Sequence, residues 1–205
     1  MKTKELILDS ALKLFAKKGY EAVSVAEIAD AVGVKAPSLY KHYKSKQDIF
    51  DSIIQRINEL DYEKAQDYDM PSSPAAEDSE SYGDISPENI GVYAKAMLLH
   101  WTSEEFTCNF RRMLTLEQYK TPKMNELYQN YIAGGPVNYM ADIFFGFSDI
   151  SKSRAYEYAV EFYAPMYLMY SLYDSGADVK TLTEMLERHT EKFIKRLNIK
   201  RRDQL

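Results

Sequence analysis

The sequence predicts an all-α protein, and three observations support this. Apolar residues recur at spacings of three and four over most of the 205 residues, which is the period of an amphipathic helix. No long run alternates apolar and polar residues between turn residues, as a strand would. Ser, Thr, Pro and Gly stand where the helical pattern starts and stops, as helix caps do. The length fits one large domain or two small ones.

The first expected helix lies within the first 18 residues. Its apolar stripe consists of Leu8, Ala11, Leu12 and Phe15. The stripe is followed by Lys17-Lys18-Gly19, and basic residues followed by a glycine are typical of a helix C-terminus. We therefore expect this helix to end at Lys17-Lys18-Gly19.

Residues 24–50 predict two short helices joined by a tight turn and followed at once by a third helix start. Ser24 and Glu27 have the S-x-x-E spacing of a capping box. Gly33 stands where helices commonly end in a left-handed conformation that glycine adopts at low cost. The next helix begins near Ala36, with a proline in its first turn. This order of elements is a helix-turn-helix, which places its second helix in the DNA major groove.

Charge and side-chain type favour DNA binding over an ordinary helical hairpin for this motif, which spans about 24–43. Four lysines between residues 35 and 46 have no acid among them. Ser, Tyr, Lys and His side chains in the second helix can reach phosphates and base edges. The residues expected to contact DNA are Ser24, Lys35, Ala36, Pro37, Ser38, Tyr40, Lys41, His42 and Lys46.

The net charge of −5 is unevenly distributed along the chain. Residues 1–60 hold 10 Lys/Arg and 8 Asp/Glu, a balance of +2, whereas residues 61–110 hold 2 and 11, a balance of −9. Residues 111–205 return to +2, with 14 against 12. Charges more than about 10 Å from a duplex are mostly screened at 0.1 M salt. We therefore expect a compact DNA contact confined to the N-terminal region.

Helical patterning continues after residue 46. We expect a long helix at about 46–65 and a solvated, acidic loop at about 67–86, where Pro, Ser and Gly interrupt the pattern. This loop could cover a ligand site or could be a plain connection. Further helices are expected at about 86–101, 103–120, 121–133, 137–147, 151–173 and 178–197, with Gly134-Gly135-Pro136 as a separator and a kink at Pro165.

Several function classes have no support in the sequence. There is no phosphate-binding, nucleophile-elbow, dinucleotide-binding or zinc-protease motif, so no catalytic residue, cofactor or metal site is expected. His42, His100 and His189 lie far apart, without metal-ligand spacing to Cys108. Cys108 is expected to be a small buried apolar residue in a reducing cytoplasm. No apolar run approaches the ~20 residues that span a membrane, and charges near the start break any signal-peptide core.

Aromatic and methionine side chains are concentrated after residue 90. Tyr and Trp combine an apolar body with a polar tip, and Met adapts to irregular shapes, so these residues suit an apolar or amphipathic small molecule. They could equally be plain core. The candidates for lining a ligand cavity are Tyr93, Met97, His100, Trp101, Phe106, Phe110, Met113, Tyr128, Tyr131, Tyr163 and Tyr167.

The stretch from Ile7 to Phe50 closely resembles the N-terminal domain of TetR-family transcriptional regulators. The matching residues are Ile7, Ala11, Leu14, Phe15, Gly19, Tyr20, Ser24, Ile28, Ala29, Gly33, Val34, Leu39, Tyr40, His42, Tyr43, Ser45, Lys46 and Phe50. Residues 33–43 are the family's turn and recognition helix almost without change. One departure is Lys35, where many relatives have a Ser that caps the recognition helix.

The resemblance implies a helix-turn-helix DNA-binding domain at 1–46 and a helical ligand-sensing and dimerisation domain at 47–205. It further implies a cytoplasmic homodimer, formed through the last two helices, that represses transcription from a pseudo-palindromic operator. An effector bound among the C-terminal helices would release the operator. Two other interpretations stay open. One is a DNA-bound adaptor of the same fold whose C-terminal surface binds a protein, and the other is a small helical enzyme.

Overall fold

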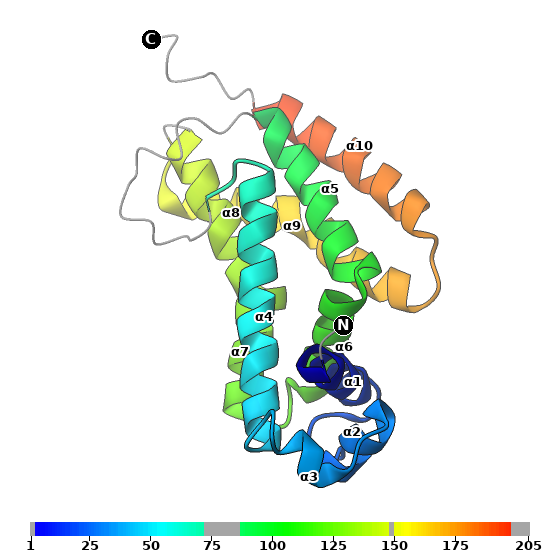
Figure 1. Cartoon of the computed structure of the whole chain (residues 1–205). Coiled ribbons are helices and arrows are strands. Elements are labelled where there is room, and N and C mark those ends of the chain that lie inside the picture. Colours follow the sequence, from blue (N-terminus) through cyan, green and yellow to red (C-terminus); the bar gives the residue numbers. More distant parts are fainter. Residues whose placement is uncertain (1–2, 72–86, 148–149, 198–205) are drawn as a thin grey trace. The chain divides into compact units, whose positions relative to one another are not determined.

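The computed structural model describes residues 3–71, 87–147 and 150–197, and every regular element within these ranges is a helix (Figure 1). The predicted all-α class is therefore confirmed. The expected loop at 67–86 has its residues 72–86 outside the described part. The helices are α1 (Thr3–Lys18), α2 (Val25–Val32), α3 (Ala36–Leu39), α4 (Lys46–Asp67), α5 (Pro87–Ser103), α6 (Glu105–Glu117), α7 (Pro122–Ile132), α8 (Gly134–Phe147), α9 (Lys152–Asp174) and α10 (Val179–Leu197).

Two elements differ from the sequence expectation. The Gly-Gly-Pro at 134–136 forms the first turn of α8 instead of separating two helices. Pro136 fits there because the first N–H groups of a helix have no intrahelical acceptor in any case. The second helix of the helix-turn-helix is only one turn long, since α3 ends at Leu39. Tyr40, Lys41 and His42 follow it in turn conformation.

The chain forms two compact units. Unit 1 comprises Met1–Leu60 and Glu105–Tyr128, and unit 2 comprises Asp61–Glu104 and Gln129–Leu205. Helix α4 contributes its first part to unit 1 and its last residues to unit 2. The predicted domain boundary between residues 46 and 47 stays a prediction. It separates functional domains, whereas the two compact units are defined by packing.

Unit 1 is built on contacts of α1 with α6 and α2. The apolar stripe of α1 is buried as expected at Ala11, Leu12 and Phe15. Its fourth buried residue is Ile7 and not the expected Leu8. Other large residues of this unit with almost no exposure include Ile28, Leu39, Ile49, Phe50, Ile53, Ile57, Phe110, Met113 and Leu114. The buried side chains of α4 lie on one face, so burial of this face fixes the helix against the unit's core.

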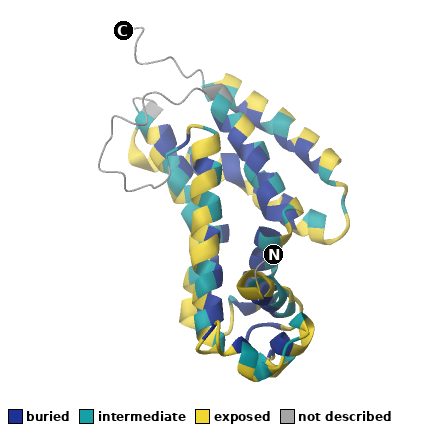
Figure 2. Cartoon of the chain, in the orientation of Figure 1, coloured by how far each residue is buried: buried dark blue, intermediate teal, exposed yellow. Residues whose placement is uncertain are grey.

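Unit 2 is built on contacts of α8 with α9 and of α10 with α5 and α9. Phe144, Phe162 and Phe193 form a mutual ring cluster, with centroid separations between 5.3 and 5.6 Å. Helix α10 carries a buried stripe that includes Leu182 and Leu186, beside exposed polar residues (Figure 2). Burial of these aromatic rings supplies a large apolar area at the junction of three helices.

Candidate functional site

The helix-turn-helix is fixed locally by its caps. Ser24 Oγ accepts the Glu27 backbone N–H at 3.2 Å, and Glu27 Oε2 accepts the Ser24 N–H at 2.8 Å, so the predicted capping box is present. Lys18 lies 2.8 Å from the Glu27 carboxylate; together with the two Ser24 hydrogen bonds it lowers the pKa of Glu27 to about 2. Gly33 ends α2 with φ at +76°, the left-handed conformation expected of it.

The one-turn helix α3 is anchored on one side and open on the other. Leu39 is fully buried, and the Tyr43 ring is buried with its hydroxyl donating to the Lys4 carbonyl at 3.3 Å. Tyr40, by contrast, is 53% exposed, and Lys41 and His42 are also exposed. The two buried anchors therefore direct the polar residues of this segment toward solvent.

The structure places the predicted DNA contacts in two groups. Ser24, Lys35, Pro37, Tyr40, Lys41 and His42 are exposed, and Ala36 and Ser38 are half-buried in the same segment. Lys35 precedes α3 without a side-chain cap hydrogen bond, which agrees with the departure noted at this position. These eight residues are available to a duplex; the ninth, Lys46, differs.

Lys46 is engaged inside unit 1. Its ammonium donates to the backbone carbonyls of Tyr20 at 2.9 Å, Val23 at 3.0 Å and Glu21 at 3.4 Å, and it lies 4.4 Å from the centroid of the Tyr20 ring. A lysine ammonium has three donors, and these contacts direct all of them at the turn before α2. Lys46 is therefore better placed to hold this turn than to contact a phosphate.

The Tyr20 side chain also holds the turn before α2 against the core of unit 1. Its ring packs against Phe15 at 5.1 Å and Phe50 at 5.0 Å between centroids, and its hydroxyl donates to Gln47 Oε1 at 3.2 Å. Residues of α1 and α4 thus hold Tyr20, which lies in the turn four positions before Ser24, the N-cap of α2.

The structure divides the predicted ligand-lining residues between the two units. Phe106, Phe110, Met113 and Tyr128 belong to unit 1, and Tyr93, Met97, His100, Trp101, Tyr131, Tyr163 and Tyr167 belong to unit 2. Within unit 2, Tyr163 donates its hydroxyl to the Ile132 carbonyl at 2.6 Å, whereas Tyr167 is 44% exposed. Tyr163 is therefore held by a hydrogen bond within the fold, and Tyr167 lies at the surface.

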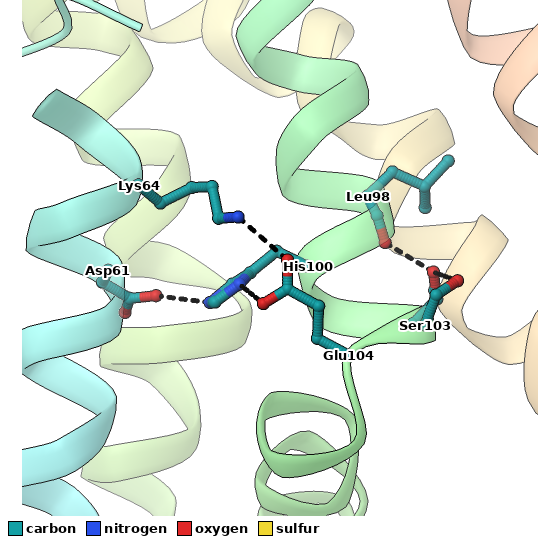
Figure 3. Close-up of polar contacts among 7 residues, drawn as sticks. Asp61, Lys64, Leu98, His100, Ser103 and Glu104 are labelled. Carbon is teal, nitrogen blue, oxygen red and sulfur yellow. Dashed lines mark hydrogen bonds and ion pairs between the residues drawn. The ribbon is translucent and has the colours of Figure 1, made fainter. Parts of the chain in front are cut away.

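His100 is the centre of a charged cluster in unit 2 (Figure 3). It is fully buried, with Nδ1 2.7 Å from Glu104 Oε2 and Nε2 3.1 Å from Asp61 Oδ1. Lys64 Nζ lies 2.9 Å from Glu104 Oε1, so the order along the cluster is Asp61, His100, Glu104, Lys64. A neutral imidazole has one N–H, which can donate to only one of the two carboxylates. Hydrogen bonds to both Asp61 and Glu104 therefore need a second proton, either on the ring or on a carboxylate.

The two carboxylates of this cluster respond in opposite directions. Burial raises the pKa of Asp61, although the hydrogen bond with His100 opposes the shift. Burial also acts to raise the pKa of Glu104, but the contacts with Lys64 and His100 outweigh it and hold that pKa below its usual value. Within this cluster the ionised form is therefore favoured more strongly at Glu104 than at Asp61.

Tyr93 lies in an aromatic group of unit 2 with Tyr68 and Tyr139. The ring centroids are 6.1 Å from Tyr68 and 6.2 Å from Tyr139, and the Tyr139 hydroxyl donates to the Pro71 carbonyl at 2.9 Å. Burial, assisted by the negative charge of Asp61, raises the pKa of Tyr93 to about 12. A hydrogen bond with the Tyr139 side chain opposes this rise, so the Tyr93 hydroxyl already has a partner within the aromatic group.

Raising the pH from 10 to 12 is expected to destabilise the protein through Tyr93. An unfolded Tyr has its pKa near 10 and the folded one near 12, so the folded state keeps its proton longer and loses stability as the pH rises between these values. The loss should reach about 2–3 kcal/mol. Urea unfolding along this range measures it, and Tyr93→Phe should remove this share of the pH dependence. Equal pH profiles for the two proteins would contradict the assignment.

An open groove of about 340 Å³ lies between α8 and α9 in unit 2. It is lined by Asn138, Ala141, Asp142, Phe145, Lys152, Ala155 and Tyr156. None of these residues was among the predicted ligand contacts. Within the described residues no group of three or more His, Cys, Asp or Glu side chains could hold a metal ion. No helix among them is long and apolar enough to cross a membrane.

The outer face of α9 is apolar and exposed. Tyr156, Val160 and Leu168 lie on this face at spacings of four and eight, with exposures of 48%, 42% and 58%. Tyr167 and, on α10, Met185 are also more than 40% exposed. Large exposed apolar patches on soluble domains commonly mark sites of association.

Residues 7–53 match the family described as bacterial regulatory proteins, tetR family. Over this N-terminal segment the chain is similar to the TetR family. The chain is 42% identical over 53 residues to the HTH-type transcriptional repressor ComR of Escherichia coli K12, covering 26% of this chain and 25% of ComR. It is 42% identical over 65 residues to the HTH-type transcriptional regulator AcrR of Shigella flexneri, covering 30% of each chain. These matches span less than a third of the curated relatives.

Solved structures resemble this chain over nearly its whole length. A transcriptional regulator of the TerR/AcrR family from Aquifex aeolicus has a TM-score of 0.67 at 18% identity, covering 93% of this chain and 99% of that one. FadR from Bacillus subtilis, in complex with stearoyl-CoA, has a TM-score of 0.60 at 16% identity, covering 91% and 96%. At these identities the likeness shows the fold, and it confirms the predicted helix-turn-helix domain followed by a helical C-terminal domain. The matched curated relatives are named as a transcriptional repressor and a transcriptional regulator.

Proposed function

We propose that this chain is a homodimeric repressor that binds a pseudo-palindromic operator through residues 24–43 and is released by an apolar or amphipathic small molecule. The observation that carries the proposal is the open polar side of the segment 35–42, held outward by Leu39 and Tyr43 on a capped helix-turn-helix. A one-turn helix reads few base pairs, so useful specificity requires two copies on two half-sites. Binding to chromosomal DNA requires the protein to act in the cytoplasm.

The proposed DNA contacts differ in their roles. Lys41 supplies a point charge to a phosphate, and Tyr40 and His42 lie on the same exposed segment. Ser38, half-buried on α3, is the candidate for reaching a base edge. Lys46 contributes by holding the turn before α2 and not by direct contact.

Replacing Lys41 with Ala is expected to weaken binding to all DNA sequences alike. Removal of one phosphate contact should reduce the slope of log affinity against log salt by about 0.9. Titration of the operator at several salt concentrations, by fluorescence anisotropy, measures both quantities. Ser38→Ala is the matched control, since it should alter base preference and leave the slope unchanged. An unaltered slope in Lys41→Ala would mean that the segment meets the duplex in another orientation.

The proposed dimer uses the exposed apolar faces of α9 and α10. A two-fold interface repeats the same patch on both copies, so one self-complementary apolar face is sufficient to close the dimer. Tyr156, Val160 and Leu168 on α9 supply that face, together with Met185 on α10.

The proposed effector site lies among the aromatic residues of unit 2, near Tyr93 and His100. Tyr93, Tyr68 and Tyr139 offer apolar ring surface. The charged cluster around His100 adds polar groups. This combination suits an amphipathic molecule. Stearoyl-CoA, bound by a solved protein of the same fold, is one molecule of that class.

The function is tested by selecting DNA from a random pool and then screening compounds. Inverted repeats should be recovered, and a compound that raises the melting temperature should also release the operator, because the two equilibria are linked reciprocally. At one hundred times its dissociation constant a compound should stabilise the fold by about 2.7 kcal/mol. Recovery of single half-sites by a monomer would contradict the dimer. Stabilising compounds that leave operator affinity unchanged would instead favour an adaptor that binds a protein.

A further inference from the structure

The last residue of α6 contacts the turn between α1 and α2 in unit 1. Glu117 is buried, with only 1% of its side chain exposed. Its Oε1 accepts the backbone N–H of Tyr20 at 2.9 Å and lies 2.7 Å from the Lys120 ammonium. No local pattern in the sequence indicates this hydrogen bond, since Glu117 and Tyr20 are 97 positions apart.

The hydrogen bond is strong because its acceptor is charged and shielded from water. Hydrogen bonds to an ionised group are about twice as strong as neutral ones. Removing Glu117 would leave a backbone N–H without its acceptor in a buried position, and the resulting cost exceeds the net value of an ordinary hydrogen bond. Lys120 lies beside the buried carboxylate and balances its charge.

Gly19 permits the close approach of this carboxylate. A Cβ at position 19 would lie 2.5 Å from Glu117 Oε1 and 2.8 Å from Lys120 Nζ. Any larger residue would push the carboxylate away from Tyr20 N–H. The φ of +84° at Gly19 also favours glycine.

The turn is therefore held from two helices. Helix α6 holds the Tyr20 N–H through Glu117, and α4 holds the carbonyls of Tyr20, Glu21 and Val23 through Lys46. The residue after Val23 is Ser24, the cap of α2 and a proposed DNA contact. A change in the position of α6 would therefore move the start of the helix-turn-helix.

We propose that Glu117 is a positioning residue for operator binding, which couples the position of α6 to the helix-turn-helix through the Tyr20 amide. The proposal rests on the proposed function. Helix α6 starts at Glu105, the residue after Glu104 of the charged cluster, so chain continuity links the proposed effector region to the Glu117–Tyr20 hydrogen bond.

The test compares three variants of the full chain for operator affinity and for exchange of the Tyr20 amide proton. Glu117→Ala should weaken operator binding about tenfold and speed Tyr20 exchange by a similar factor, the change expected for one charged hydrogen bond. The salt slope should stay unchanged, because Glu117 touches no phosphate. Glu117→Gln should recover most of the affinity, since its amide oxygen still accepts from Tyr20. Lys120→Ala should have a smaller effect than Glu117→Ala.

A folded Glu117→Ala variant with wild-type affinity would overturn the proposal, as would a Gln variant as weak as the Ala variant. If Glu117→Ala does not fold, Glu117→Asp keeps the charge, shortens the reach to Tyr20 and should give the same weaker binding and faster exchange. Gly19→Ala provides an independent test, since it should cost less affinity in a Glu117→Ala background than alone. Full additivity would contradict a shared interaction. Failure of the wild-type chain to bind any DNA would instead reject the proposed function, while Tyr20 exchange would still report the hydrogen bond.

Discussion

Replacing His100 with Leu is expected to destabilise the protein by about 3 kcal/mol, a large effect for a single substitution. The substitution removes the group that bridges Asp61 and Glu104 and leaves Asp61 Oδ1 without its donor in a partly buried position. Two carboxylates then face each other with Lys64 as the balancing charge. The free energy of unfolding in urea at neutral pH measures the effect.

Two controls separate removal of the bridge from a change in packing. Asp61→Asn should cost much less than His100→Leu, because the amide keeps a hydrogen-bonding group beside His100 Nε2. The double variant His100→Leu/Asp61→Leu should recover part of the stability, since removing both partners of a buried pair is less costly than removing one. If the double variant is as unstable as the sum of His100→Leu and Asp61→Leu measured singly, packing and not the bridge determines the effect.

The sequence predicted the features that depend on near neighbours. The Ser24–Glu27 capping box, the left-handed Gly33 and the amphipathic face of α4 are all set by residues within four positions, and each was found as expected. Likewise, the last two helices were located to within one residue, because their caps and breakers are local. The helix-turn-helix and the all-α class follow from such local signals.

The features that the sequence did not reveal depend on residues far apart in the chain. Lys46 has the type and spacing of a phosphate contact, but the carbonyls of the turn that it meets lie more than 20 positions away. His100 was identified as a ligand candidate from its type alone, yet its partner Asp61 is 39 positions away. The eleven ligand candidates share composition and helical spacing, and neither property indicates which compact unit a helix joins.

Charge on the outer face of α9 is expected to abolish dimerisation and to lower operator affinity by at least about 100-fold. Leu168 is 58% exposed, so Leu168→Glu should leave the fold of one copy intact and place a carboxylate in an apolar two-fold interface. Two-fold symmetry doubles the effect, because each copy brings the same charge. A monomer retains one half-site and forgoes the gain from simultaneous engagement of two, which can reach about 10²–10⁴.

Sedimentation velocity and operator titration measure the two effects on the same sample. Tyr119→Glu is the matched control: Tyr119 is 87% exposed, also apolar and lies outside α9 and α10, so its substitution should leave both the dimer and the operator affinity unchanged. Val160→Glu, at 42% exposure on the same face, should repeat the result of Leu168→Glu. A Leu168→Glu protein that stays dimeric would place the interface elsewhere. A folded monomer with full operator affinity would remove the argument that two half-sites are needed.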